Sequence, residues 1–155
     1  MNFSKLYFLA LACYLGMQTK TLTIEPEIFK ITTENAPEAI GPYSQALRAG
    51  DYLFISGQLG IDPLTKKFTG ETAEEQTRQV LKNMEGILNA AGGTFKNVVK
   101  TEVYLKDLND FQAMNKVYAE AFSHEIEPTR LTIQAAKLPL DGLVEIVCIA
   151  YIPAK

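Results

Sequence analysis

The stretch GLVEIVCIAY, from Gly142 to Tyr151, constrains the fold more than any other part of the sequence. Its alternate positions are apolar on both sides, which is typical of a strand buried on both faces. One side would carry Leu143, Val147 and Ile149, and the other Val144, Ile146 and Cys148. Glu145 breaks this pattern, and an unpaired carboxylate is costly to bury. The stretch therefore predicts a central strand whose one charged residue needs a partner or a function.

The clearest helix is predicted from Thr72 to Ala91. Thr72 and Glu75 have the spacing of a capping box, in which each residue satisfies a backbone N–H of the other. Gly92 and Gly93 end the helix. Apolar residues recur at helical spacing between these limits, at Val80, Leu81, Met84, Ile87, Leu88 and Ala91.

The remaining elements follow from alternation and turn residues. We expect a strand at Phe29–Glu34, a hairpin that turns at Gly50 and Asp51, and a second helix at Asn109–Ser123. The segments NVVKTEVYLK and TRLTIQAAKL read as strands, and Val99, Thr101, Val103 and Leu105 would share the dry face of the first. The order β-β-β-α-β-α-β-β predicts an α+β fold with one mixed sheet and two helices on one face.

Two helices can cover only one face of such a sheet. No further segment is left to cover the other face of the strand at Gly142–Tyr151. We therefore expect another subunit to bury it, so that the protein forms an oligomer.

Composition narrows the function classes. The chain has 155 residues, 47% of them hydrophobic and 21% charged, which is typical of one soluble globular domain. A net charge of -3 without a basic run argues against a nucleic-acid partner. The single histidine, His124, excludes a Ser-His-Asp triad, and no Cys/His cluster has metal-ligand spacing. We expect no metal and no organic cofactor.

Residues 1–26 differ from the rest and read as an N-terminal extension to a domain at 27–155. The apolar run from Leu6 to Met17 is too short to span a membrane and is similar to the core of a signal peptide. Three interpretations stay open: a secretory signal, a membrane-associating or disordered tail, or a true start at Met17. We expect a cytoplasmic protein, or an exported one if residues 1–17 act as a signal, with membrane association only through this extension.

Four sequence segments resemble the RidA/YjgF family of enamine/imine deaminases. They are ENAPEAIGPYSQA, LFISGQLGIDP, NMEGILNAAGG and PTRLTIQAAKLPLDGLVEIVCIAY, in the family's order and spacing. The resemblance implies a chorismate-mutase-like fold that assembles as a homotrimer around an inner barrel, with active sites in clefts between subunits.

The resemblance also implies roles for individual residues. Arg130 matches the arginine that binds the substrate carboxylate, and Glu145 matches the glutamate that positions the attacking water. The implied neighbours in the substrate-binding cleft are Tyr43, Ser56, Gly57, Asn115 and Thr132. Better-known members carry Cys at position 132, where the family's contact is largely through the backbone, so we expect Thr132 to be tolerated and to affect which substrate side chains fit.

The implied reaction suits these residue types. The substrates are 2-aminoacrylate, 2-iminopropanoate and 2-iminobutanoate, and hydrolysis gives a 2-keto acid and ammonia. A guanidinium binds a planar carboxylate through two parallel hydrogen bonds. A carboxylate can orient a water at the imine carbon and take its proton.

Each residue also has a purely structural interpretation. Arg130 could form a surface ion pair, and Glu145 could be half of a buried pair with Arg130. Tyr43 could pack in a turn, Ser56 could bond a neighbouring backbone group, and Asn115 could be an ordinary helix residue. Two other functions stay open: a non-catalytic ligand-binding or regulatory trimer, and an RNA-acting protein, which the acidic balance of the chain argues against.

Overall fold

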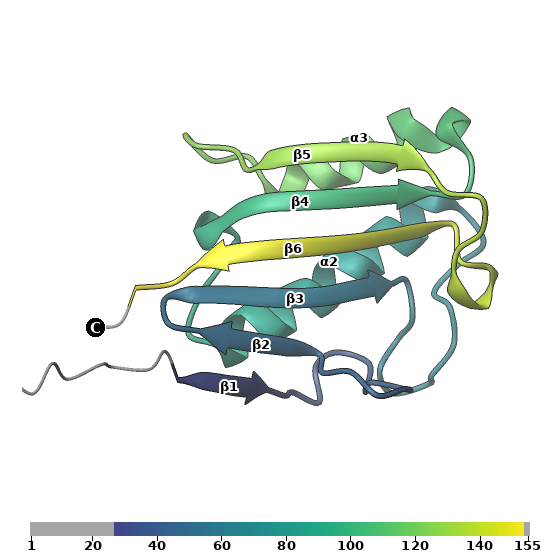
Figure 1. Cartoon of the computed structure of the whole chain (residues 1–155). Helices are drawn as coiled ribbons and strands as arrows, with labels where there is room; N and C mark the ends of the chain where they lie inside the picture. The colour runs from purple at the N-terminus through teal and green to yellow at the C-terminus, as the bar shows by residue number, and fades with distance from the viewer. Residues whose placement is uncertain (1–26, 154–155) are drawn as a thin grey trace, which may run out of the picture.

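A computed structural model describes residues 27–153, and these form one six-stranded sheet with two helices packed behind it (Figure 1). The elements are β1 (Ile28–Ile31), β2 (Ala46–Ala49), β3 (Tyr52–Leu59), α2 (Ala73–Ala90), β4 (Val98–Leu105), α3 (Phe111–Ala121), β5 (Thr129–Gln134) and β6 (Val144–Tyr151). The strand order is β1-β2-β3-β6-β4-β5. Only the β4–β5 pair is parallel, so the predicted mixed sheet is confirmed. The predictions for residues 1–26 lie outside the described residues.

The strand β6 lies in the middle of the sheet, between β3 and β4. Its even-numbered side chains are buried beneath the helices, at Val144, Ile146, Cys148 and Ala150. Its other face carries Glu145, Val147 and Ile149, which are half-buried, and Tyr151, which is exposed. Both faces are apolar as predicted, but residues 27–153 cover only one of them. We call the other the open face.

The helix α2 forms as its sequence predicts. Thr72 Oγ1 accepts a hydrogen bond from the backbone N–H of Glu75, and the Glu75 carboxylate accepts from the backbone N–H of Thr72. Gly92 follows the helix with a φ of 78°, a left-handed conformation that glycine adopts at little cost. The predicted apolar stripe is buried in the core at every position: Val80, Leu81, Met84, Ile87, Leu88 and Ala91.

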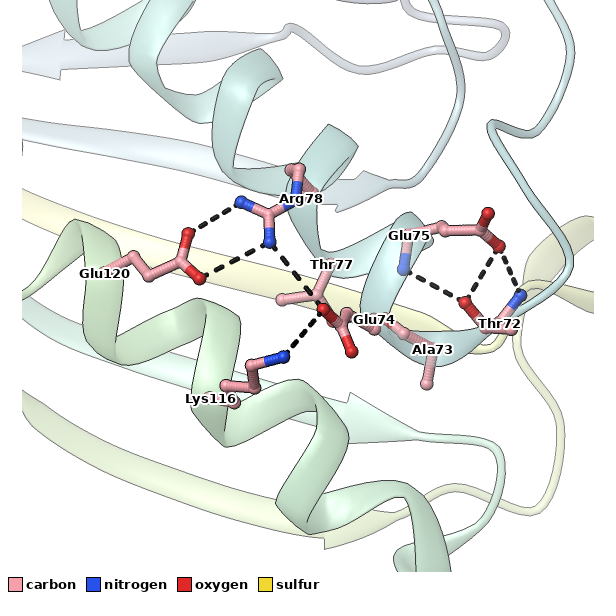
Figure 2. Close-up of polar contacts among 8 residues, drawn as sticks. All are labelled: Thr72, Ala73, Glu74, Glu75, Thr77, Arg78, Lys116 and Glu120. Carbon is pink, nitrogen blue, oxygen red and sulfur yellow. Dashed lines mark hydrogen bonds and ion pairs between the residues drawn. The ribbon is translucent and has the colours of Figure 1, made fainter.

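Ion pairs hold α3 at a fixed position along α2 (Figure 2). Arg78 Nη1 lies 2.6 Å from Glu120 Oε2, and Lys116 Nζ lies 3.2 Å from Glu74 Oε1. A hydrogen bond from Arg78, reinforced by its charge, holds the pKa of Glu120 below its usual range. These exposed pairs contribute little to stability singly, but together they fix which residues of α3 face the sheet edge.

Three sequence expectations need correction. Val99 does not join the dry face of β4, because a bulge between Val98 and Lys100 shifts the register and Val98 takes the buried position. The second helix begins later than expected, since residues 108–110 form a 3-10 turn before α3. The first strand is Ile28–Ile31 and not Phe29–Glu34.

The open face is rich in large apolar side chains. On the strand pairings, Tyr52, Phe54 and Tyr151 share this face, and the Tyr52 ring lies 5.4 Å from the Tyr151 ring. The large apolar side chains that lie on this face and are at least 40% exposed include Ile28, Leu47, Tyr52, Phe54, Leu131, Ile133 and Tyr151. Exposed apolar patches are typical of interaction surfaces in proteins.

Candidate active site

Arg130 lies on the helix side of the edge strand β5. Its pairing partner in β4 is Thr101, whose buried hydroxyl contacts the Tyr118 hydroxyl at 2.7 Å, so both side chains face α3. Arg130 Nη1 donates to Asn115 Oδ1 at 2.8 Å. The guanidinium carbon lies 4.6 Å from the centre of the Tyr118 ring and 5.7 Å from that of Phe111. One stripe of α3 therefore holds this cation in place.

The remaining donors of Arg130 are available to a ligand. The side chain is exposed, and Asn115 is its only hydrogen-bond partner among residues 27–153. Cation–π contact and one hydrogen bond fix the orientation of the guanidinium without using its other N–H groups. Asn115, which the resemblance implies as a neighbour in the cleft, thus contacts Arg130, and among residues 27–153 the arginine forms no ion pair.

Thr132 lies two residues after Arg130 on the same side of β5, opposite Val103. Its Oγ1 is buried and has no hydrogen-bond partner among the described residues. The hydroxyl of Thr132 is therefore inaccessible to solvent in a single chain.

Glu145 lies on the open face, beside a bulge in β3. Ser56 and Gly57 form this bulge, because the β3–β6 register shifts between Ile55 and Gln58. The Glu145 carboxylate lies against Gly57, and a Cβ atom at position 57 would overlap it. The bulge and the missing side chain together make room for the carboxylate.

Burial raises the pKa of Glu145 above its usual range. Among residues 27–153, the carboxylate has no hydrogen bond and no ion pair. Arg130 does not lower this pKa in the single chain, because the two side chains lie on opposite faces. The carboxylate is therefore a stronger base than a solvated glutamate, and its lone pairs are free for a water or a substrate.

Ser56 and Tyr43 belong to the Glu145 half of the site. Ser56 Oγ donates to the carbonyl of Ser44 at 2.6 Å, so this hydroxyl joins the bulge to the loop that carries Tyr43. Tyr43 is 49% exposed, and its hydroxyl accepts from the backbone N–H of Ile40. Tyr43 and Gly57 line a cavity of about 390 Å³, whose apolar walls include Ile40, Leu59, Leu64 and Leu140.

Sequence reasoning missed Gln45, which holds the Tyr43 loop. Its side chain is 4% exposed, and its Nε2 donates to the carbonyls of Thr33, Ala36 and Pro37 at 2.8–3.0 Å. Its Oε1 accepts from the backbone N–H of Thr33 at 2.8 Å. A polar residue just before a strand gives no sign of such a role, because its partners are carbonyls of a distant loop.

The structure thus divides the predicted site into two groups. Arg130, Asn115 and Thr132 lie on the helix side of β5, and Glu145 with the Tyr43 loop lies on or beside the open face. No cluster of three or more metal-binding side chains occurs in the part of the chain that the structure describes. Within residues 27–153, no helix is long and apolar enough to cross a membrane.

Comparison with known proteins identifies the family. A sequence model of the family described as Endoribonuclease L-PSP matches residues 33–152. The chain belongs to this RidA/YjgF/RutC family. A RutC family protein of Pyrococcus horikoshii is 54% identical over 121 residues, which cover 78% of this chain and 95% of the relative. Reactive Intermediate Deaminase A, chloroplastic, of Arabidopsis thaliana is 45% identical over 137 residues, 88% of this chain and 72% of that protein.

Solved structures of RidA-family proteins have the same fold. RidA from the Antarctic bacterium Psychrobacter sp. superposes with a TM-score of 0.77 at 44% identity, covering 80% of this chain and 99% of that one. Escherichia coli TdcF with bound serine gives a TM-score of 0.76 at 38% identity, covering 79% and 98%. The predicted family and α+β fold are therefore confirmed.

Proposed function

We propose that this protein hydrolyses 2-enamino and 2-imino acids, such as 2-aminoacrylate and 2-iminopropanoate, to 2-keto acids and ammonia. The observation that carries the proposal is Arg130, an exposed guanidinium oriented by Asn115 and two rings with most of its donors free. Support comes from the 45% identical Arabidopsis relative, which is named a reactive intermediate deaminase. The TdcF structure supports it too, because serine has an α-carboxylate beside an α-nitrogen, as a 2-imino acid does.

The two groups of residues have complementary tasks in this proposal. Arg130 binds the substrate carboxylate through two parallel hydrogen bonds. Glu145 holds a water at the imine carbon and takes one of its protons as the C–O bond forms. That proton passes to the nitrogen and gives a carbinolamine. The hydroxyl of the carbinolamine then gives the second water proton to the nitrogen through Glu145, the C–N bond breaks, and a carbonyl and ammonia are formed. The reaction involves no oxidation or reduction, so it needs no redox cofactor.

A homotrimer with its sites between subunits forms part of the proposal. Support comes from the apolar open face and from the separation of Arg130 and Glu145 on opposite faces. A neighbouring subunit that covers the open face could bring its own Arg130 to the Glu145 of the first chain.

The test is imine hydrolysis itself. An amino acid oxidase generates 2-iminopropanoate in the presence of semicarbazide, and the protein is expected to reduce the semicarbazone formed by accelerating release of pyruvate. Arg130→Ala should abolish this effect while the circular dichroism spectrum stays unchanged. A wild-type protein that binds 2-keto acids without accelerating hydrolysis would be a binding protein instead. Cleavage of RNA without imine hydrolysis would favour the nuclease function in the family's description.

A further inference from the structure

Three polar side chains of β4 form a hydrogen-bonded row on the open face. Lys100 Nζ lies 2.6 Å from Glu102 Oε1, and the Tyr104 hydroxyl donates to Glu102 Oε2 at 2.7 Å. The hydrogen bonds from Lys100 and Tyr104 hold the pKa of Glu102 below its usual range. Glu102 is therefore ionised, and Lys100 compensates its charge.

The row lies among apolar neighbours. Glu102 pairs with Val147 of β6 on one side and Leu131 of β5 on the other, and Lys100 lies beside Ile149. The Lys100 and Glu102 side chains are 47% and 27% exposed, so the row is partly solvated in a single chain. Within the row, both carboxylate oxygens of Glu102 accept hydrogen bonds, one from Lys100 and one from Tyr104.

The row ends beside Glu145. Tyr104 is the direct pairing partner of Glu145 across the β4–β6 ladder. Its hydroxyl donates to Glu102, and this hydrogen bond, followed by burial and the Glu102 charge, raises the pKa of Tyr104; the Glu145 charge is a smaller contribution in the same direction. Glu102 is the diagonal neighbour of Glu145, and such pairs have Cβ atoms about 7–8 Å apart. Two carboxylates thus share this face, one compensated by Lys100 and one without a partner.

We propose that Lys100, Glu102 and Tyr104 adjust the charge state of Glu145 in addition to its burial, with Lys100 and Glu102 as a balanced pair and Tyr104 as the spacer between the two carboxylates. The catalytic meaning of this inference rests on the proposed function, in which Glu145 must be ionised to take a proton from water. The expected effect of these three residues on the titration of Glu145 does not depend on the proposed function.

Other groups also face Glu145, and in the proposed trimer they include the Arg130 of a neighbouring subunit, which is the same in every row variant. On β3, the residues beside it are Gly57 and Leu59, neither of which titrates. On the opposite face, α2 reaches the start of β6 through the neutral amide of Gln76, which accepts from the Leu143 N–H. The cavity next to Gly57 is lined by four charged residues, Glu34, Glu38, Asp62 and Lys66, and these stay unchanged in the variants compared below.

The proposal predicts shifts of opposite sign from two substitutions in one row. Glu102→Gln keeps an acceptor for Tyr104 and removes a negative charge, so it should lower the pKa of Glu145. Lys100→Met leaves the Glu102 charge uncompensated, so it should raise that pKa. At diagonal separation on a partly solvated surface, each change should be about half a pKa unit.

The experiment is a carboxyl titration of the full-length protein labelled with ¹³C at the glutamate side chains. The Glu145 signal is the one that disappears in Glu145→Gln. The matched control is Lys116→Met, which removes a lysine paired with a glutamate on the helix side and should leave the Glu145 titration unchanged. Shifts in the same direction, or no shift in either row variant, would overturn the proposal.

The pH dependence of imine hydrolysis is the second readout. The acidic midpoint of the rate should move down in Glu102→Gln and up in Lys100→Met, as the carboxyl titration does. If the wild-type protein does not hydrolyse imines while the titration shifts as expected, the proposed function fails and the electrostatic inference stands. If the rate profile is normal but the titrations do not move, only the inference about the row fails.

Discussion

Arg130 and Glu145 lie on opposite faces of one sheet and are offset along it. Thr101 of β4 lies beside both Arg130 and Cys148, whereas Glu145 is three residues before Cys148 in β6. Three residues of strand span about 10 Å, and the side chains point away from each other. One chain therefore cannot hold both groups against one small substrate, and this separation leads to the first prediction.

Two inactive variants should complement each other. Arg130→Ala and Glu145→Gln proteins, mixed and allowed to exchange subunits, should regain roughly a quarter of the wild-type activity, because about that share of neighbouring pairs combines an intact Arg130 with an intact Glu145. The measurement is imine hydrolysis before and after exchange. Mixing Arg130→Ala with a variant that carries both substitutions is the control and should restore nothing. Complementation in the control, or none in the test mixture, would contradict a site shared between subunits.

Arg130→Lys should lose at least tenfold in kcat/KM. Lysine keeps the charge but loses the planar fork that forms two parallel hydrogen bonds with a carboxylate. It also loses the geometry that fits the Asn115 amide and the Tyr118 ring. Steady-state kinetics with 2-iminopropanoate measures the effect, and Arg78→Lys on the outer face of α2 is the control. Near wild-type efficiency in Arg130→Lys would mean that charge alone anchors the substrate.

Glu145→Gln should lower activity while it raises stability at neutral pH. Burial raises the pKa of Glu145 in the folded protein, so folding binds protons in the acidic range and stability falls as pH rises through that pKa. Glutamine at position 145 does not titrate, so the variant does not lose stability as pH rises. The Tm difference from wild type should thus be positive at pH 7 and vanish near pH 4, while the single-turnover rate falls about 10²-fold. A lower Tm with an unchanged rate would make Glu145 a structural residue.

Gln45→Met should destabilise the protein and loosen the Tyr43 loop. The substitution keeps side-chain length but removes the bonds to Thr33, Ala36 and Pro37. Leaving these groups without partners should reduce the free energy of unfolding by about 2–4 kcal/mol. Urea denaturation measures this change in the free energy of unfolding. Steady-state kinetics should show a raised KM with a nearly unchanged kcat, which would mean that the loop affects substrate binding and not the chemical step. Gln112→Met, on the exposed side of α3, is the control and should change neither.

Size-exclusion chromatography with light scattering should give about three times the 17.2 kDa mass of the chain. Phe54→Glu places a charge in the middle of the apolar open face and should yield smaller species. Glu85→Lys, a charge change on the surface of α2, should not. A folded wild-type monomer would contradict the proposed assembly.

Most of the fold could be predicted because its signals are local. The capping box at Thr72 and the stripe from Val80 to Ala91 need no knowledge of other segments. The alternation in β6 likewise identified the central strand and its uncovered face. The bulge that displaces Val99 was missed, because a bulge depends on the partner strand and not on the alternating strand itself.

The candidate site was less predictable. Its residues came from a family resemblance, and sequence alone gave no means to assign Arg130 and Glu145 to faces. The face of an edge strand depends on its register with β4, which the sequence does not encode locally. The hydrogen bonds of Gln45 to three carbonyls join segments that are distant in the sequence. The hydrogen-bonded row at Glu102 depends on side-chain rotamers. Such features cannot be predicted from a local sequence pattern.

The aromatic contact between Tyr52 and Tyr151 gives the protein its own optical probe. The chain has no tryptophan, so its seven tyrosines dominate near-ultraviolet absorption and emission. Two of them lie in contact on the open face, beside Phe54. Covering that face would remove water from both rings and change their dichroism and emission without any added label. Under the proposed assembly, association and dissociation of subunits at this face should therefore be observable in real time on the unmodified protein.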